Sequence, residues 1–394
     1  ASSATTVLGQ GTADQVLTSD GTDIAWADAS GGASDIDGLS DCLVENNSMW
    51  LGNDPSGTTD TASYCIGIGA TALDAITTGD HNVAIGYGAM DAVTEGYQSV
   101  GIGYNALGSM TVDGENVAIG YDALKSVTGS VSGNTAVGSN AGYNNTGIGN
   151  TFLGCSTSSS SAHYNTMVGH SSGHYLNTGG ENVYVGVHAG SVATSGDQNV
   201  YVGGYAGYAS TTGENNTALG YQTMDALTTG THNTALGNHS MGSGVVTGIG
   251  NNSVGYAALV SLTSGTYNIG LGAYAGSYIT TGDNNIMIGF EAGNTGSPGG
   301  EISTADNEIC LGDENISNAN IQVAWSVASD KRDKTDVSPM DLGLEFINQL
   351  EPVTYRWDKR IKYSDDQSAT PDGTHKEEQL EGGFLAQDVE AIEE

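Results

Sequence analysis

The sequence predicts an all-β protein: a β-solenoid or β-roll shaft with a 17-residue repeat, forming a parallel homotrimer and followed by a small α+β domain. A glycine recurs about every 17 residues and closes a five-residue unit, Asn-apolar-x-apolar-Gly. The 394 residues include 60 glycines but only four Phe and four Trp, too few large side chains for a thick globular core. Basic residues gather almost entirely after residue 330, which sets that region apart.

The anchor glycines define the repeat and mark an architecture in which each unit buries its apolar face against its neighbours. Seventeen residues suit one coil of a parallel solenoid with two short strands and two turns. The anchors are Gly52, Gly69, Gly86, Gly103, Gly120, Gly138, Gly154, Gly169, Gly186, Gly203, Gly220, Gly237, Gly255, Gly272 and Gly289.

One coil illustrates the expected elements. The alternation of small and β-branched residues in 82–86 predicts the first strand. Residues 87–90 are predicted to form a bend and the second strand, and Thr77-Thr78-Gly79-Asp80 has the composition of a turn. Because a single coil of Ala, Val, Ile and Gly buries little apolar surface, we expect chain-to-chain contacts about a symmetry axis, as a parallel homotrimer.

The recurrent asparagine of the unit is predicted to form a ladder of side-chain amides that hydrogen-bond along the shaft axis, since equivalent positions stack one strand spacing apart. The anchor glycine then lies where the backbone turns or packs too closely for a Cβ. The ladder residues are Asn82, Asn116, Asn182, Asn199, Asn216, Asn233, Asn268 and Asn285.

A tyrosine often follows the anchor glycine directly, so these rings should align along one edge of the shaft. Such a row either packs on itself or across a trimer interface, or contacts a receptor by stacking on sugar rings. The tyrosines in this phase are Tyr87, Tyr104, Tyr121, Tyr221 and Tyr256.

The cysteines and histidines of the sequence predict no cofactor and no specific metal site. Divalent cations could bind the acidic surface. The spacings of the four cysteines match neither zinc sites nor disulfide frameworks, so buried thiols are expected. Where the period shortens, a looped-out or interface patch is expected rather than a zinc site. That stretch contains His163, Tyr164, His170, His174 and Tyr175.

Charge distribution excludes several partners and locates the last domain. Residues 1–329 hold 28 acidic side chains and one basic residue, Lys125, a balance that disfavours binding to nucleic acid. The sequence contains no stretch of 18 apolar residues, so it predicts no membrane-spanning helix. From Asp330 onward, the spacing of apolar residues over 342–350 predicts a helix, and 353–357 predicts a strand.

These features divide the chain into four segments. We expect an N-terminal connector over 1–46, a shaft of about 15 to 16 coils over 47–313, a junction over 314–329 and a C-terminal domain over 330–394. The last segment ends within an amphipathic pattern, so we expect the chain to continue past Glu394.

The shaft unit Asn-Val-Ala-Ile-Gly-Tyr-Gly-Ala at 82–89 resembles the head repeats of trimeric autotransporter adhesins and the shaft repeats of phage tail fibres. Residues 11–21, followed by Trp26, look like a segment common in phage tail-fibre proteins. The resemblance implies a virion fibre that attaches to a host surface.

Three C-terminal blocks, 329–334, 350–357 and 383–390, resemble the intramolecular chaperone domain of endosialidase-type tailspikes. The resemblance implies a domain that templates trimerisation and then releases itself by cutting before Asp330, with Ser329 as nucleophile and Lys334 as its base. A serine hydroxyl needs such a base to take its proton. Asp333 stands where that family has an apolar residue.

The predicted function is therefore that of a virion tail-fibre protein, extracellular, whose partners are its own copies, other tail proteins and a host glycan or protein receptor. Self-cleavage is the only enzymatic activity predicted. One alternative is a cellular trimeric surface adhesin or appendage. Another is a polysaccharide-degrading tailspike, which needs two carboxylates a substrate's width apart, and the sequence does not single out such a pair.

Overall fold

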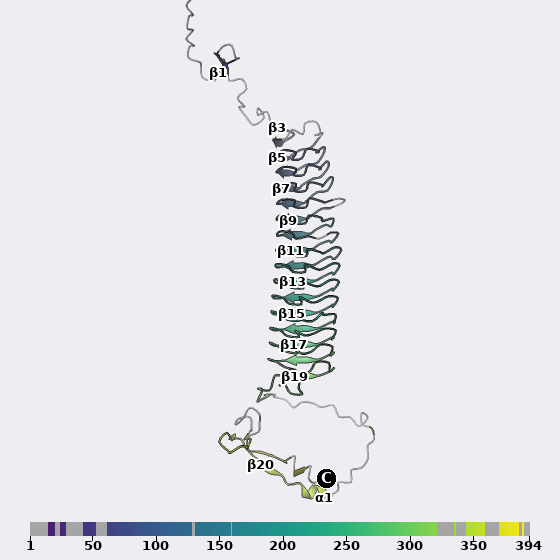
Figure 1. Ribbon diagram of the computed structural model, residues 1–394, viewed down its shortest axis with the longest axis vertical. Helices are drawn as coiled ribbons and strands as arrows, with labels where there is room; N and C mark the ends of the chain where they lie inside the picture. Colours follow the sequence, from purple (N-terminus) through teal and green to yellow (C-terminus); the bar gives the residue numbers. More distant parts are fainter. Residues whose placement is uncertain are drawn as a thin grey trace, which may run out of the picture. The chain divides into compact units, whose positions relative to one another are not determined.

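The computed structural model describes residues 42–52, 61–127, 131–158, 160–320, 335, 344–358, 370–385 and 388–389, together with the backbone of two N-terminal strands. The chain divides into two compact units, Ala1–Ala319 and Asn320–Glu394. The first contains a β-solenoid of stacked coils, so the predicted all-β solenoid fold is confirmed (Figure 1), and the homotrimer stays a prediction. The four segment boundaries expected from the sequence remain predictions.

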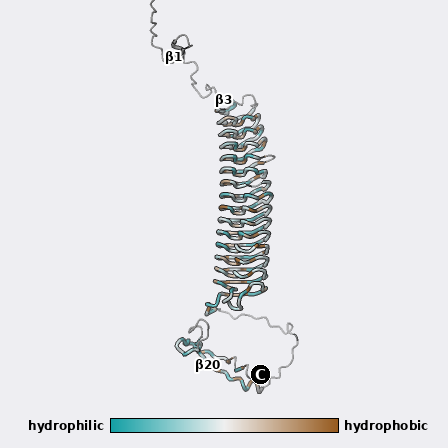
Figure 2. The backbone as a smooth tube through the Cα atoms, viewed as in Figure 1, coloured by the Kyte–Doolittle hydropathy of each residue, from teal (hydrophilic) through white to brown (hydrophobic). Residues whose placement is uncertain are grey.

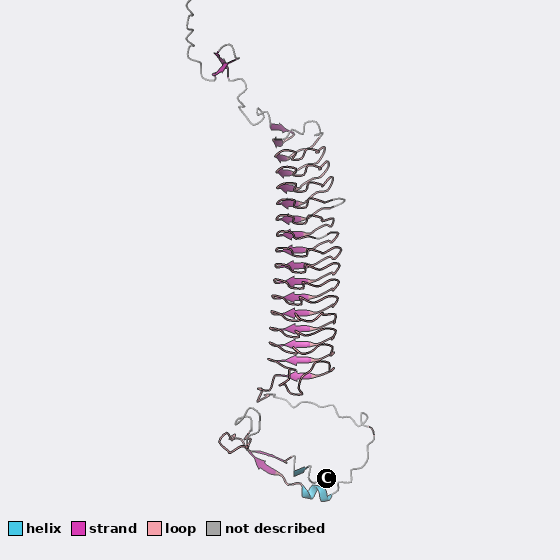
Figure 3. Ribbon diagram, viewed as in Figure 1, coloured by secondary structure: helices cyan, strands magenta, loops and turns pink. Residues whose placement is uncertain are grey.

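One continuous sheet runs the length of the solenoid, with its short strands stacked on one side and the turns on the other (Figure 3). β3 forms an antiparallel hairpin with β4, and every later strand pairs in parallel with the next one along the chain. The strands are β3 (Cys42–Glu45), β4 (Ser48–Leu51), β5 (Ile66–Ile68), β6 (Val83–Ile85), β7 (Val100–Ile102), β8 (Val117–Ile119), β9 (Thr135–Val137), β10 (Thr151–Leu153), β11 (Thr166–Val168), β12 (Val183–Val185), β13 (Val200–Val202), β14 (Thr217–Leu219), β15 (Thr234–Leu236), β16 (Asn252–Val254), β17 (Ile269–Leu271), β18 (Ile286–Ile288) and β19 (Ile309–Leu311).

The predicted second strand of each coil is wrong, because the residues after the anchor form turns. Alternate residues there take positive φ, as at Asn105 (51°) and Leu107 (56°). Their backbone N–H groups point in opposite directions: Asn105 donates to Tyr87 O of the preceding coil and Leu107 donates to Ala123 O of the following coil, each at 3.0 Å. These bonds between coils offset the cost of a left-handed conformation, about 1–2 kcal/mol per residue.

The anchor glycines are required by both conformation and space. Gly86 has φ of 129°, and a Cβ built on it would lie 2.6 Å from the carbonyl oxygen of Gly103 in the next coil. Neighbouring anchors therefore pack backbone to backbone, and no other residue type fits between two coils at this corner.

The core is thin and lies inside each coil. Apolar and polar residues accordingly alternate along every coil instead of gathering in one block (Figure 2). The central residue of each strand points inward and is buried, and where it is Met or Tyr its side chain lies over the fourth residue after the anchor glycine. We call these two places the strand site and the turn site.

The strand site and the turn site are reciprocal in size. In one kind of coil the strand residue is small and the turn residue is Leu or Met: Gly67 with Leu73, Ala84 with Met90, Gly101 with Leu107, Ala118 with Leu124, Ala218 with Met224, Ala235 with Met241, and Ser253 with Leu259. In the other kind the strand residue is large and the turn residue is glycine: Met167 with Gly173, Tyr184 with Gly190, Tyr201 with Gly207, and Met287 with Gly293. The reciprocity keeps the core volume of these coils similar, as close packing requires. Two coils are small at both sites, Ala136 with Gly142 and Gly270 with Gly276, and side chains of the adjacent coils reach their turn glycines.

Tyr184 and Tyr201 are the largest ring pair of this core. Their rings stack with centroids 5.1 Å apart and an interplanar angle of 5°. The hydroxyl of Tyr201 donates to Ser210 Oγ at 2.8 Å, whereas the Tyr184 hydroxyl has no partner among the described residues. Burial raises the pKa of both hydroxyls, which therefore stay protonated.

Within the residues that the structure describes, two strand pairs and one helix lie outside the solenoid. β1 (Gln15–Ser19) pairs antiparallel with β2 (Ile24–Asp28). In the second unit α1 (Leu344–Gln349) precedes β20 (Val353–Tyr355), which pairs antiparallel with β21 (Glu381–Gly383). The predicted C-terminal helix and strand are thus present, each shorter than expected.

Candidate functional site

The predicted asparagine ladder residues lie inside the coils, fully buried, at the residue before each strand. From Asn182 to Asn268, the backbone N–H and the Nδ2 group of each ladder residue donate to the Oδ1 atom of the preceding asparagine, as from Asn199 to Asn182 at 2.9 and 3.2 Å. Asn199 Nδ2 also donates to Gly213 O at 2.8 Å. Each amide thus satisfies three backbone or side-chain groups that the thin core would otherwise leave unpaired.

The ladder is longer than the sequence pattern indicated. It runs without interruption from Asn82 to the backbone N–H of Glu308, and a serine hydroxyl takes the place of the amide at Ser99. The members that sequence reasoning did not single out are Asn134, Asn150, Asn165 and Asn251. Each lies four residues before its anchor glycine, as the predicted members do, so this spacing alone could have identified them.

The predicted tyrosine row is in two parts. Tyr87, Tyr104 and Tyr121 stack face to face, with centroids 5.4 and 5.2 Å apart. The next two coils place Ser139 and Cys155 at this position, which interrupts the row.

Tyr221 and Tyr256 belong to a second, longer row that we call the aromatic rail. Eight consecutive coils each contribute one ring, from either the first or the second residue after the anchor, and successive centroids lie 5.1–6.3 Å apart. Sequence reasoning missed most of its members because it followed only tyrosines, and only at the first of these two positions. The rail consists of His170, His188, Tyr205, Tyr221, His239, Tyr256, Tyr274 and Phe290.

The outer face of the sheet is an uncovered apolar surface along the whole solenoid. The first and third residues of every strand from β5 to β19 point outward, and all are Val, Ile, Leu or Thr except Asn252. Many remain substantially exposed, for example Leu219 at 46%. An apolar surface this continuous is typical of an interaction site.

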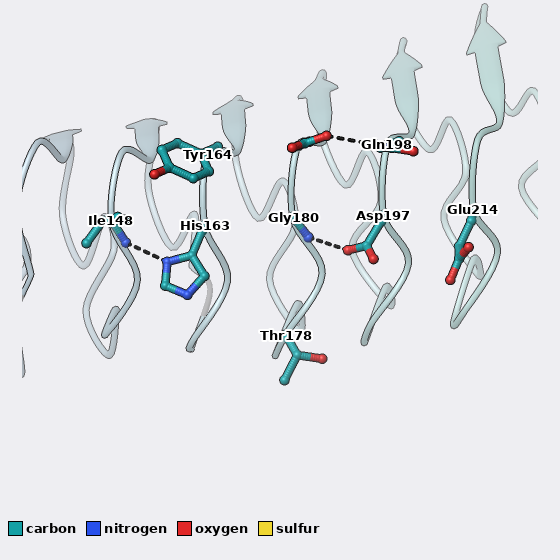
Figure 4. A pocket seen from close by; sticks show the side chains of 9 residues that line it. Ile148, His163, Tyr164, Thr178, Gly180, Asp197, Gln198 and Glu214 are labelled. Carbon is teal, nitrogen blue, oxygen red and sulfur yellow. Dashed lines mark hydrogen bonds between the residues drawn. The ribbon is translucent and has the colours of Figure 1, made fainter.

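A shallow groove of about 510 Å³ crosses five successive coils on the turns that precede the strands (Figure 4). Aromatic and apolar side chains line one end, and carboxylates and an amide line the other. Its lining residues are Ile148, His163, Tyr164, Thr178, Gly180, Glu181, Asp197, Gln198 and Glu214.

The histidine-rich stretch where the period shortens is not looped out, which corrects that part of the expectation. His163 and Tyr164 immediately precede β11 (Thr166–Val168) in an ordinary coil, and the shortening falls in the turns. No three His, Cys, Asp or Glu side chains in the described ranges are arranged to hold a metal ion. The buried-thiol expectation is correct for Cys65 and Cys310 but wrong for Cys155, which is exposed.

Ser329 and Lys334, the implied cleavage residues, lie outside the described residues. In the described part of the second unit, Glu381 is the main polar contact of the hairpin: its Oε2 atom accepts from Trp357 Nε1 at 3.2 Å and from the Tyr355 hydroxyl at 3.5 Å.

Comparison with known proteins identifies the C-terminal segment. Residues 329–394 match the family model described as chaperone of endosialidase. Together with the solenoid, this match supports a tail-fibre- or tailspike-like protein that carries a C-terminal chaperone domain. No curated protein and no solved structure shows significant similarity to the chain. Within the described residues, no helix combines the length and the apolar character that crossing a membrane requires.

Proposed function

We propose that this chain is part of a phage tail fibre located in the virion, where its shaft assembles as a parallel homotrimer and attaches the particle to a host surface. The solenoid supplies length: at about 4.8 Å per coil, 15 coils extend about 70 Å. Three copies of one binding surface on a rigid shaft would also increase avidity.

The observation that carries the proposal is the uncovered outer face of the sheet. Apart from Asn252, it presents two apolar or threonine side chains per coil from β5 to β19, without a charged residue, in a chain of net charge −36. Exposed in a monomer, such a face favours aggregation. Packing this face against the same face of other copies would cover it over the full length of the shaft.

The C-terminal chaperone gives the assembly its register. Coils that share one backbone path allow chains to pair one coil out of step at small cost. A trimeric domain at one end would align the three chains before the shaft forms. The family match begins at Ser329, the residue that the resemblance implies as nucleophile, so we propose that this domain is released by cleavage before Asp330 once the shaft is complete.

Light scattering on the full chain tests the assembly. Three chains of 40.0 kDa give an uncut trimer of about 120 kDa. Leu219→Glu together with Leu236→Glu, on the outer face, should yield monomers or aggregates. The matched pair Val112→Glu and Val245→Glu, exposed outside the sheet, should leave the trimer intact. A monomeric wild-type chain would refute the fibre.

A denaturing gel of the same samples tests the cleavage. Release before Asp330 should shorten the wild-type chain but not Ser329→Ala, while the assembled shaft persists in both. An uncut wild-type chain that is trimeric would refute the release and leave the fibre proposal standing.

A further inference from the structure

The groove of Figure 4 exists because one residue in a column of side chains is glycine. The sixth residue before the anchor is Ile148, His163, Gly180, Asp197 and Glu214 in five successive coils. Gly180 contributes no side chain, so the groove floor opens there between an aromatic end and an acidic end (Figure 4).

The aromatic end is held in place before any ligand binds. Tyr164 is 60% exposed and its ring lies over Gly149, where a Cβ would come within 2.7 Å of Tyr164 Cδ1. The backbone N–H of Ile148 donates to His163 Nδ1 at 3.1 Å, which fixes the imidazole beside it. A ring that is fixed yet exposed binds a flat apolar surface with little loss of conformational entropy.

The acidic end presents hydrogen-bond acceptors in fixed positions. Asp197 Oδ1 accepts from the backbone N–H of Gly180 at 2.6 Å, and Glu181 Oε2 accepts from Gln198 Nε2 at 2.9 Å. The carboxylate of Glu214 has no hydrogen-bond partner among the described residues. A carboxylate accepts about four hydrogen bonds, so most of the acceptor capacity here is free.

Electrostatics restricts the ligand class. The groove contains no lysine or arginine, and Lys125 is the only basic residue before Lys331. Phosphate and carboxylate ligands are therefore repelled. Since the described side chains also form no metal site, the ligand must bring hydroxyl donors for the carboxylates and an apolar face for Tyr164.

We propose that this groove binds a segment of a neutral polysaccharide laid along the shaft axis. The apolar C–H face of a pyranose packs on Tyr164, and hydroxyls further along the chain donate to Glu181, Asp197 and Glu214. Four coil steps span about 19 Å, the length of a short oligosaccharide. The inference rests on the proposed attachment function and assigns it a ligand class and a site.

The test is an array of neutral and anionic bacterial polysaccharides probed with the full chain, whose assembly state is measured by light scattering in the same sample. The wild type should bind neutral members only. Tyr164→Ala should lower binding at least tenfold, and Glu214→Gln severalfold. Tyr267→Ala is the matched control, because Tyr267 is 63% exposed and lies over Gly250 as Tyr164 lies over Gly149, but the next coil places Asp283 at the column position where the groove has Gly180.

Each outcome supports or overturns the proposed glycan site or the proposed fibre. Binding to anionic members only, no binding at all, or equal loss in Tyr164→Ala and Tyr267→Ala would overturn the glycan site. A trimer that binds no glycan would leave the fibre proposal intact, whereas a monomer that binds neutral glycans through Tyr164 would refute the trimeric fibre and keep the site.

Discussion

Gly207 lacks a side chain where the ring of Tyr201 lies, and a Cβ on Gly207 would overlap ring atoms of Tyr201. The two residues occupy the turn site and strand site of one coil. In coils such as Gly101 with Leu107 the strand residue is small and the turn residue is large, and the leucine has φ of 56°, close to the 58° of Gly207. The two arrangements therefore share one backbone.

This relationship predicts that exchanging the large and the small residue between the two sites will restore part of the stability that each single substitution removes. Tyr201→Ala should cost about 3–5 kcal/mol through the cavity it leaves. Gly207→Leu should destabilise by overpacking. The double variant should recover about 1–3 kcal/mol relative to the sum of the two, measured as a double-mutant cycle by thermal unfolding. Additive effects would show that the two sites do not share volume.

Removal of one ladder amide should destabilise the shaft. Asn233 Oδ1 accepts from Asn251, and its Nδ2 donates to Gly248 O at 2.9 Å. Asn233→Ala leaves these buried groups unpaired, at about 1–3 kcal/mol each. The melting temperature should fall clearly, while the exposed change Asn238→Ala should leave it unaltered. Equal melting of the two variants would remove the ladder as a source of stability.

The anchor glycines should tolerate no side chain. Gly86→Ala meets the Gly103 carbonyl and also takes an unfavourable φ. Gly299→Ala is the control for conformation alone, because Gly299 has φ of 87° but nothing within 4 Å of a Cβ. We expect a loss of about 1–2 kcal/mol for Gly299→Ala and more than twice that for Gly86→Ala, measured by chemical unfolding. Similar losses of stability in the two variants would show that glycine is required at Gly86 for its φ alone and not for lack of space.

The aromatic rail should stabilise the second half of the shaft. Tyr205 contacts the rings of His188, Tyr208 and Tyr221. At about 0.5–1.5 kcal/mol for each of these three pairs, Tyr205→Ala should lower stability by about 1.5–4.5 kcal/mol. Tyr278, which contacts no other ring in the described ranges, serves as the control when changed to alanine. A thermal shift no larger than the control's would mean that the rings meet without stabilising the coils.

Stability near Asp225 should depend on pH. Burial raises the pKa of this carboxyl in the folded state, and the nearby imidazole of His239 opposes the shift in part. A raised folded pKa means that the native state binds more protons than the unfolded state, so stability falls as pH rises through the interval between the two values. Asp225→Asn should therefore raise the melting temperature at pH 7 and have little effect near pH 3. A pH-independent effect would contradict this origin.

The sequence predicted the stacking direction but not the conformation of the turns. The alternation in 82–86 is a strand signal that depends on side-chain type, and β6 forms there. In the turns, Leu107 and Met90 adopt positive φ, which their residue types disfavour, because hydrogen bonds to two neighbouring coils outweigh local preference. Such a tertiary effect cannot be read from one coil.

The candidate sites were only partly predictable for a related reason. Tyr221 and Tyr256 were expected in one row, yet the ring between them, His239, comes from the following position, because at a corner two consecutive residues both reach the surface. The groove depends on Gly180 interrupting a column of residues that are 15 to 17 positions apart. Its acidic residues carry no local motif, so their proximity appears only when the coils are stacked.

The two kinds of coil described above occur in runs, and this order constrains how the shaft changes length in evolution. From Gly69 to Gly120 all coils have the small strand residue, so a duplicated coil would pack between two coils of its own kind. At the boundary, Ala136 and Gly142 leave a space that Phe152 and Leu124 fill from the adjacent coils. An extra coil inserted there would move Phe152 or Leu124 away from the space that its side chain fills. Lengthening is thus compatible with packing inside a run and costly at its edges, so related fibres should vary in coil number within runs while keeping their boundaries.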